Sequence, residues 1–380
     1  MQFIKGDNFL NRFQCDWLRG LAIMGIFLHN FCHWLKGANQ ENEYTFLIDR
    51  SNEMWDYWMG GNIDGFFPIQ FFSFMGHYGV PIFLFLSGFG LVRKYEQTDG
   101  SERLKILPFI GYQWLKLFRL MILGFILSVT TYLLCGTAWK GILEYLSQAV
   151  MINNLFGLNN TPGPYWFFCL MFEVYVLYII FFYPSHHKPN SKWRWLVPVI
   201  FIVLTWLLQA ILVDHRNVLN SLRHNAVVAM LPFSMGVLVA RYGFPKLPKW
   251  LLAVIAVLSL VGVAIANMHY QSWLWSPVLV IAGAVAFVKC VEGNSVCRTI
   301  LKPVAWMGVM SSFIFVVHSI PRIPMFQFVL WRQRDLMPTD YAWFAAYIVL
   351  TLVLAWLYKK YLELIPRPRL KGNKIAFYKS

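Results

Sequence analysis

Long apolar runs are the feature that most limits what this chain can fold into. A window of about nineteen residues finds ten candidate spans, each close to the roughly 17 to 25 residues that a helix needs to cross the hydrocarbon core of a bilayer. They run over 17–35, 77–93, 113–135, 165–183, 194–213, 224–242, 250–268, 272–291, 302–320 and 342–363. We therefore predict an all-α, polytopic membrane protein, a bundle of about ten transmembrane helices.

The composition supports this fold class. Hydrophobic residues make up 58% of the 380 positions and charged residues 13%, whereas soluble chains have about 25% charged residues. Soluble, collagen-like, disordered and disulfide-scaffold classes are excluded. We expect a single membrane-embedded domain over 1–380, with a long extracytoplasmic loop at 36–76 and a basic cytosolic tail at 364–380.

The placement of the charges predicts the topology. The net charge is +15, and 25 of the 33 Lys and Arg residues fall on one side if the loops alternate between the two faces of the membrane. Lys and Arg prefer cytoplasmic loops, so the pattern predicts that both termini are cytosolic. Because the charges lie between apolar runs, they indicate contact with membrane lipid and not with nucleic acid. The six cysteines lack the paired spacing of a zinc site, and no metal is expected.

Ionisable side chains inside a span are costly and mark candidate sites. The first span carries His29, Asn30 and His33, and the two histidines, four residues apart, share one face of the helix. Histidine can take a proton from a hydroxyl near neutral pH, which predicts a general-base site here, although each histidine alone could be a packing residue. Glu173 lies deep in the fourth span and must be paired, protonated or facing water.

Basic residues gather where the second span ends and the third begins. Arg93 and Lys94 end the second span, while Lys116 and Arg119 share a face near the start of the third. Four cations at one membrane face could bind a phosphate-bearing ligand. The alternative is ordinary positive-inside charge, which directs topology and binds nothing.

Several of these fragments occur in an order that resembles the acyltransferase-3 family of integral membrane O-acyltransferases. The matching segments are DWLRGLAIMGIFLH in the first span, GVPIFLFLSGFGL in the second, KLFRL in the third, YWFFCLMFEVY in the fourth, MGVMSSFIFVVH in the ninth, and the closing stretch from Tyr361 to Pro366. The resemblance covers nearly the whole chain. It implies that Arg19 is the basic residue of the first-helix motif and a contact for the donor, and that His29 is the catalytic histidine.

The spacing of this motif departs from the family pattern. The family usually places ten residues between the basic residue and the histidine, and this chain has nine between Arg19 and His29. At about 100° per residue, ten steps put the two side chains about 80° apart, whereas His33, fourteen steps on, returns to within about 40°. The base is therefore His29, with a local adjustment of the helix, or His33.

The resemblance implies transfer of an acetyl or other short acyl group from acyl-coenzyme A, acetyl-coenzyme A in the simplest case. The acceptor would be a hydroxyl of an envelope or surface glycan, an antibiotic or a lipid-linked precursor, at a bacterial inner (cell) membrane. Glu173 or Asn30 would orient the imidazole, and Ser87, Tyr165 or His33 could carry the acyl group if transfer is indirect. The competing reading is a transporter or flippase in which His29, His33 and Glu173 relay protons; a third is an inactive scaffold for envelope assembly. The acceptor, the acyl chain and the oligomeric state are not encoded in any motif.

Overall fold

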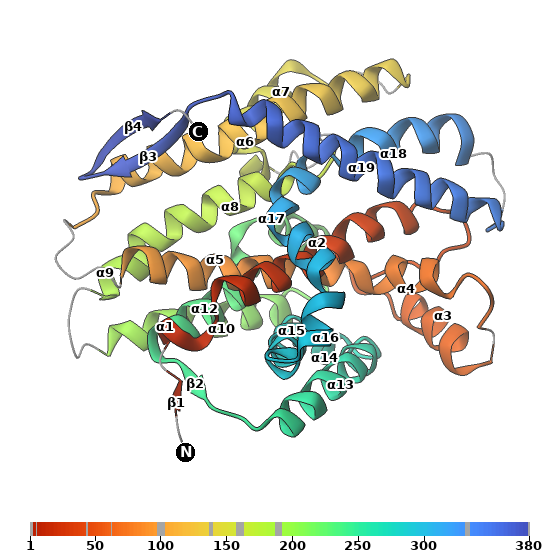
Figure 1. Ribbon diagram of the computed structural model, residues 1–380, viewed down its shortest axis with the longest axis horizontal. Coiled ribbons are helices and arrows are strands. Elements are labelled where there is room, and N and C mark those ends of the chain that lie inside the picture. The colour runs from red at the N-terminus through yellow and green to blue at the C-terminus, as the bar shows by residue number, and fades with distance from the viewer. Residues whose placement is uncertain are drawn as a thin grey trace.

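Helices account for nearly all regular structure in the computed structural model (Figure 1). The structure describes residues 3–378 except 5, 43–44, 62, 97–102, 137–139, 157–162, 187–191 and 331–334. The first half contains α1 (Gly6–Phe9), α2 (Arg12–Cys32), α3 (Ile48–Met59), α4 (Phe67–Met75), η1 (Gly76–Tyr78), α5 (Gly79–Tyr95), α6 (Ile106–Leu134), α7 (Ile142–Ala149), η2 (Asn153–Phe156), α8 (Trp166–Leu177), η3 (Tyr178–Phe182) and α9 (Tyr183–His186). The second half contains α10 (Trp193–Ile211), α11 (Arg216–Arg223), α12 (Ala226–Tyr242), α13 (Lys249–Ala266), α14 (Tyr270–Trp273), α15 (Ser276–Val291), α16 (Ser295–Ile300), α17 (Lys302–Val317), α18 (Ser319–Met325), η4 (Phe326–Leu330) and α19 (Thr339–Glu363). Four short strands form the antiparallel pairs β1 (Phe3–Ile4) with β2 (Phe244–Pro245) and β3 (Arg367–Lys371) with β4 (Lys374–Tyr378).

Six described helical segments are long and apolar enough to cross a membrane. They are Phe67–Tyr95, α6, Trp166–Ser185, α10, α13 and α19, and a bent pair formed by α17 with Ser319–Leu330 makes a seventh if it counts as one span. The shorter helices α12 and α15 are apolar as well. Each of the ten predicted segments overlaps a helix, so the all-α prediction holds. The count of ten spans and the sides of the two termini stay predictions.

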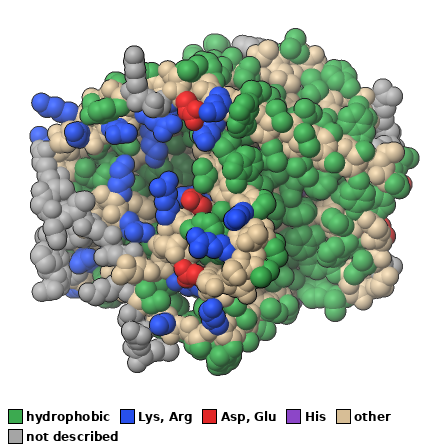
Figure 2. Space-filling model, viewed as in Figure 1, with side chains coloured by type: hydrophobic (Ala, Val, Ile, Leu, Met, Phe, Trp, Pro, Cys, Tyr) green, Lys and Arg blue, Asp and Glu red, His purple; other side chains and the backbone are tan. Residues whose placement is uncertain are grey.

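Large apolar side chains are exposed on the peripheral helices. Trp250 and Val257 on α13 are 68% and 62% exposed, and Val349 on α19 is 59% exposed. Soluble proteins rarely expose apolar surface on this scale. Figure 2 shows Lys and Arg side chains gathered on the left half of one face, while the right half is largely hydrophobic. These faces fit a multi-pass membrane protein.

The central helix α2 begins at a capping box. Asn11 accepts a hydrogen bond from the Gln14 backbone at 2.9 Å, and the Gln14 side chain accepts one from the Asn11 backbone at 2.9 Å. α2 then packs against α17 so closely that a methyl group on Gly20 would clash with the carbonyl oxygen of Val304. This close packing buries most of α2 in the middle of the bundle (Figure 1).

The connection over 36–76 contains helices α3 and α4 and is not a continuous irregular loop. α4 runs on through η1 into α5, which gives one apolar segment of 29 residues, Phe67–Tyr95. Gly76, just before the predicted start at 77, has a helical φ of −69°, so the helical path continues through it. The second predicted span therefore begins about ten residues earlier than its sequence indicated.

The segment expected as a basic tail, 364–380, forms the hairpin β3–β4 over most of its length. Gly372 and Asn373 have φ values of 51° and 57°, the left-handed conformation that a two-residue type I′ turn requires. The Asn373 side chain bonds the backbone of Arg103 at 2.9 Å and of Lys105 at 2.7 Å. The hairpin is thus attached to the segment that leads into α6.

Candidate active site

His29 lies in the last turn of α2 with its ring against α4. The side chain is 3% exposed, and its Nδ1 lies 2.9 Å from the carbonyl oxygen of Ser73 and 3.3 Å from that of Phe72. A carbonyl oxygen only accepts hydrogen bonds, so Nδ1 carries the proton and Nε2 is the nitrogen that can accept one. The backbone here sets the tautomer and ring orientation, as a carboxylate does in a catalytic triad.

Gly76 allows η1 to approach this part of α2. A methyl group at Gly76 would lie 2.5 Å from the Cβ of His29 and 2.5 Å from the carbonyl oxygen of Gly25. Only a residue without a side chain fits this contact. The position of the His29 ring therefore depends on a glycine 47 residues further along the chain.

Three imidazole rings meet at this point. The rings of His29 and His33 are 4.7 Å apart between centroids and nearly perpendicular, and the His77 ring of η1 is 5.6 Å from His29. The expected shared face of His29 and His33 is therefore present. His77, at the predicted edge of the second span, joins them from a different helix.

Glu41, in the connection after α2, lies beside the three histidines. Its Oε2 lies 3.6 Å from Nδ1 of His33, and the residue is 6% exposed. Burial raises the pKa of Glu41 to about 7 from its ordinary value of 4.5. A carboxyl group that changes charge near neutral pH thus sits beside the candidate bases.

The side chains of His29, His33 and Glu41 could also hold a metal ion, since one ligand atom from each lies within 4.8 Å of the others. Two histidines and a glutamate are a known ligand set for catalytic zinc. Nδ1 of His29 is bonded to the Ser73 carbonyl, so the metal would have to take Nε2. His29 would then be unable to accept a proton, and the metal and general-base roles exclude one another.

Asn30, expected to orient the imidazole, instead binds a buried arginine. Nη1 of Arg322 donates to the Asn30 carbonyl at 2.9 Å and to its Oδ1 at 2.8 Å, while the Asn30 amide donates to Ile26. The Arg322 guanidinium lies 4.4 Å over the Trp34 ring and is 4% exposed. Within the described residues no carboxylate pairs with it. A buried positive charge therefore lies beside the residue that follows His29.

Three of the predicted donor-binding cations line one cavity of about 430 Å³ at the C-terminal end of α5, the end away from His77. Lys94 donates to the Tyr112 hydroxyl at 3.3 Å, and Arg119 donates to the Ile365 carbonyl at 2.7 Å and to that of Leu362. The basic residues of this cavity are Lys94, Lys116, Arg119, Arg367 and Arg369, the last two from strand β3. We call this set the basic cavity. Its charge suits a phosphate-bearing ligand.

Arg19 and Arg93 are placed elsewhere, since neither lines the basic cavity. Arg19 forms an ion pair with Asp16 at 2.9 Å, and its side chain is 40% exposed. Arg93 donates to the carbonyl of Leu10 at 2.9 Å, which ties α5 to the start of the chain.

Glu173 caps a helix. Its Oε2 accepts a hydrogen bond from the backbone of Ala226 at 2.7 Å, at the first residue of α12, where a negative charge is favourable. Two of the three proposed acyl carriers are also hydrogen-bonded: Ser87 donates to the carbonyl of Phe83 at 2.8 Å, and Tyr165 donates to that of Val316 at 2.9 Å. For these three groups the structure shows local structural contacts.

Sequence reasoning passed over Arg322 and the hairpin cations. Arg322 stands four residues after His318, on the same face of an apolar segment, and that spacing was a usable signal. Arg367 and Arg369 fall in the segment predicted to be a basic tail. Their approach to Lys94 depends on a hairpin whose Gly-Asn turn between two lysines can be recognised in the sequence.

Comparison with protein families identifies the chain. The family model described as an acyltransferase domain, acyltransferase-3, matches residues 13–360, which include nearly all of α2 and α19 and the basic residues of α5 and α6. No curated protein and no solved structure gave a significant match. The matched range covers most of the chain and agrees with the order of the motifs in the sequence. The chain therefore belongs to the acyltransferase-3 family of membrane acyltransferases.

Proposed function

We propose that the protein transfers an acetyl or other short acyl group from acyl-coenzyme A to a hydroxyl of a cell-envelope or exported glycan, or of a lipid-linked precursor, at a bacterial cell membrane. The family supports an acyltransferase in general, and the donor and the acceptor are what the proposal adds. No metal takes part in it. The site consists of His29 as the base and the basic cavity as the donor-binding site.

One relationship carries the proposal. His77 precedes α5 and lies against His29, whereas Lys94 near the other end of α5 lines the basic cavity. Seventeen residues at about 1.5 Å per residue separate the two groups by about 25 Å along the helix. An elongated donor with phosphates at one end and a thioester at the other fits such a separation.

The chemistry follows from the tautomer of His29. Nε2 accepts the proton of the acceptor hydroxyl as its oxygen attacks the thioester carbonyl, and Nδ1–H stays bonded to Ser73. The carbon–sulfur bond then breaks, and the imidazolium returns its proton to the departing thiolate. The Arg322 guanidinium stabilises the negative charge that develops on the carbonyl oxygen. Transfer in one step needs no acyl-enzyme, which suits Ser87 and Tyr165 being hydrogen-bonded to carbonyls.

The test is thiol release from acetyl-coenzyme A by purified full-length protein in proteoliposomes. Wild-type protein should release thiol, and Lys116→Gln with Arg119→Gln should raise the KM for acetyl-coenzyme A at least tenfold with a smaller change in kcat. Glu363→Gln, an exchange of a charge in the last turn of α19, is the control and should leave KM unchanged. Adding a chelator should not change the rate, because the base role of His29 excludes a metal on Nε2.

Two results would contradict the proposed donor or the proposed base. No thiol release, together with no protection by coenzyme A against thermal unfolding, would overturn the donor assignment and favour the transporter reading. Loss of activity on chelation that zinc restores would replace the base by a metal held by His29, His33 and Glu41.

A further inference from the structure

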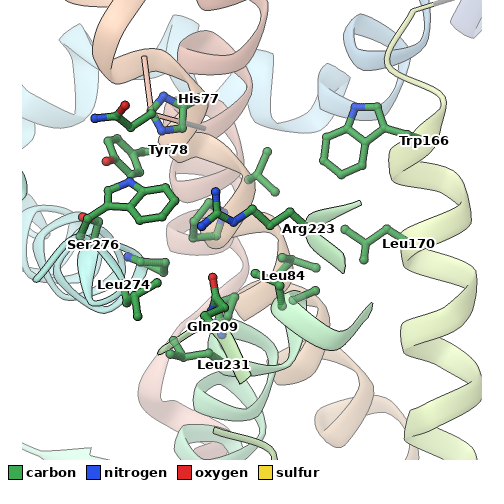
Figure 3. A pocket seen from close by; sticks show the side chains of 18 residues that line it. His77, Tyr78, Leu84, Trp166, Leu170, Gln209, Arg223, Leu231, Leu274 and Ser276 are labelled. Carbon is green, nitrogen blue, oxygen red and sulfur yellow. The ribbon is translucent and has the colours of Figure 1, made fainter. Parts of the chain in front are cut away.

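A second cavity, of about 130 Å³, opens beside the group of His29, His33 and His77 and lies apart from the basic cavity. α5, α8, α12 and α15 contribute to its walls, which are mainly aliphatic and aromatic. Figure 3 shows Arg223, from the end of α11, reaching into the middle of this cavity between His77 on one side and Gln209 on the other. A single cation thus projects into an apolar space.

Within the part of the chain that the structure describes, the guanidinium of Arg223 lacks an anionic partner. The residue is 8% exposed, and Nη1 and Nη2 are both buried without a hydrogen-bond acceptor. The guanidinium carbon lies 4.2 Å over the Trp273 ring, and the neutral Tyr270 hydroxyl, which donates its proton to the Gln209 carbonyl, also interacts with the guanidinium. Leaving a charge buried and unpaired costs several kcal/mol, which protein stability alone gives no reason to accept. A ligand that supplies the missing acceptors gives one.

Two further polar atoms around the cavity are also buried and make no hydrogen bond of normal geometry to a described residue. They are Nδ1 of His77 and Oγ of Ser276, from η1 and from the first turn of α15. Together with Arg223 they bring polar atoms from three separate elements to one small space. Arginine offers two parallel N–H groups that match a carboxylate or a phosphate, and stacking on Trp273 fixes the plane of that fork.

We infer that this cavity binds an anionic group, a carboxylate or a phosphate, carried by a substrate with an apolar or planar body. The polar atoms of Arg223, His77 and Ser276 hold the anion, and the aliphatic and aromatic walls take the body. The His77 ring lies 5.6 Å from that of His29, so the bound group lies next to the reacting centre. In naming the ligand a substrate of acyl transfer, the inference rests on the proposed function.

Binding is tested first, without any donor, so that the result does not depend on acyl transfer. The probes are butyrate, inorganic phosphate and butyramide, which has the shape of butyrate without its charge. We expect butyrate or phosphate to raise the melting temperature of the purified full-length protein, and butyramide to leave it unchanged. Arg223→Gln should weaken that response at least tenfold in probe concentration, and Arg223→Lys should restore part of it.

A matched variant separates the two cationic sites. Arg119→Gln removes a charge from the basic cavity and should leave the butyrate response intact. An equal response to butyrate and butyramide, or an equal response in wild type and Arg223→Gln, would overturn the inference and reduce the cavity to an apolar space that detergent can fill.

The stability of the ligand-free variants gives an independent check. Because Arg223 has no carboxylate partner within the described residues, Arg223→Met should melt at the same temperature as wild type or higher. A clearly lower melting temperature would show that Arg223 serves the fold, and the assignment to a ligand would then fail.

The anionic group can belong to the acceptor or to the transferred acyl group, and thiol release separates these sources. If Arg223→Gln slows release from succinyl-coenzyme A and spares acetyl-coenzyme A, the anion is the distal carboxylate of the acyl group. If both donors are affected alike in the presence of an anionic acceptor, the acceptor carries it. A protein that binds butyrate through Arg223 and releases no thiol would refute the proposed function while the cavity assignment stands.

Discussion

The rings of His29 and His33 stand 4.7 Å apart and nearly perpendicular, yet their surroundings differ. Nδ1 of His29 is held by two backbone carbonyls, whereas the nearest carboxylate oxygen to Nδ1 of His33 is 3.6 Å away. A fixed tautomer is what a general base needs, since it presents the same nitrogen to each substrate. This difference supports our proposal of His29 as the base.

The first prediction follows from this difference. His29→Ala should lower kcat for thiol release by about 10² to 10⁴, the usual contribution of a general base, whereas His33→Ala should lower it less than tenfold. Single-turnover assays on both variants, with melting temperatures recorded alongside, would measure this. The reverse order of effects would make His33 the base.

The second prediction concerns Arg322, whose charge is close enough to act on the His29 ring. If the guanidinium stabilises the developing oxyanion, Arg322→Gln should reduce kcat by about 10² with little change in the KM for acyl-coenzyme A. Arg322→Lys should recover part of the rate, because it keeps the charge. A change in KM alone, at unaltered kcat, would mean that Arg322 helps to bind the donor instead.

Part of this site could be predicted from sequence, because its signals are local. His29 and His33 share a face through helical spacing alone, and Lys116 and Arg119 do so likewise. The contacts that assign roles are not local. The carbonyl that fixes His29 belongs to Ser73, 44 residues away, and Arg322 meets Asn30 across 292 residues. Such pairs depend on how helices pack, which periodicity does not encode.

The fold shows the same division. Hydropathy located helices at all ten predicted segments, since burial in lipid requires continuous apolar runs. It missed the start of the second span, because the helical segment continues through Gly76, which allows the close approach to His29. It also gave the terminal segment no structure, although the Gly372 and Asn373 pair is a turn signal.

The third prediction tests that close approach. Gly76→Ala places a methyl group 2.5 Å from the Cβ of His29, so we expect a loss of about 1 to 3 kcal/mol in the free energy of unfolding. We also expect the protein that remains folded to have a lower kcat, because the His29 ring is displaced. Gly90→Ala on α5 is the matched control, because nothing lies within 4 Å of a methyl group there. It should be as stable and as active as wild type. Equal behaviour of the two variants would show that η1 moves without affecting His29.

The fourth prediction uses the pKa of Glu41, which burial raises to about 7. Between about pH 4.5 and pH 7 the folded protein keeps a proton that the unfolded chain has lost, so this group makes the folded state less stable as the pH rises through that range. Glu41→Gln removes the titration. It should therefore match wild type near pH 4.5 and melt at a higher temperature at pH 8, with a difference on the order of 3 kcal/mol.

Melting curves from pH 4.5 to 8, recorded with a chelator so that no metal occupies the histidine group, would measure this difference. Glu53→Gln on the exposed face of α3 is the matched control for exchanging a glutamate outside the histidine site. If wild type gains stability over Glu41→Gln as the pH rises, ionised Glu41 must pair with a protonated His33, 3.6 Å away. That outcome would make the pair a charged unit beside His29 and would bring His33 into the proton transfer.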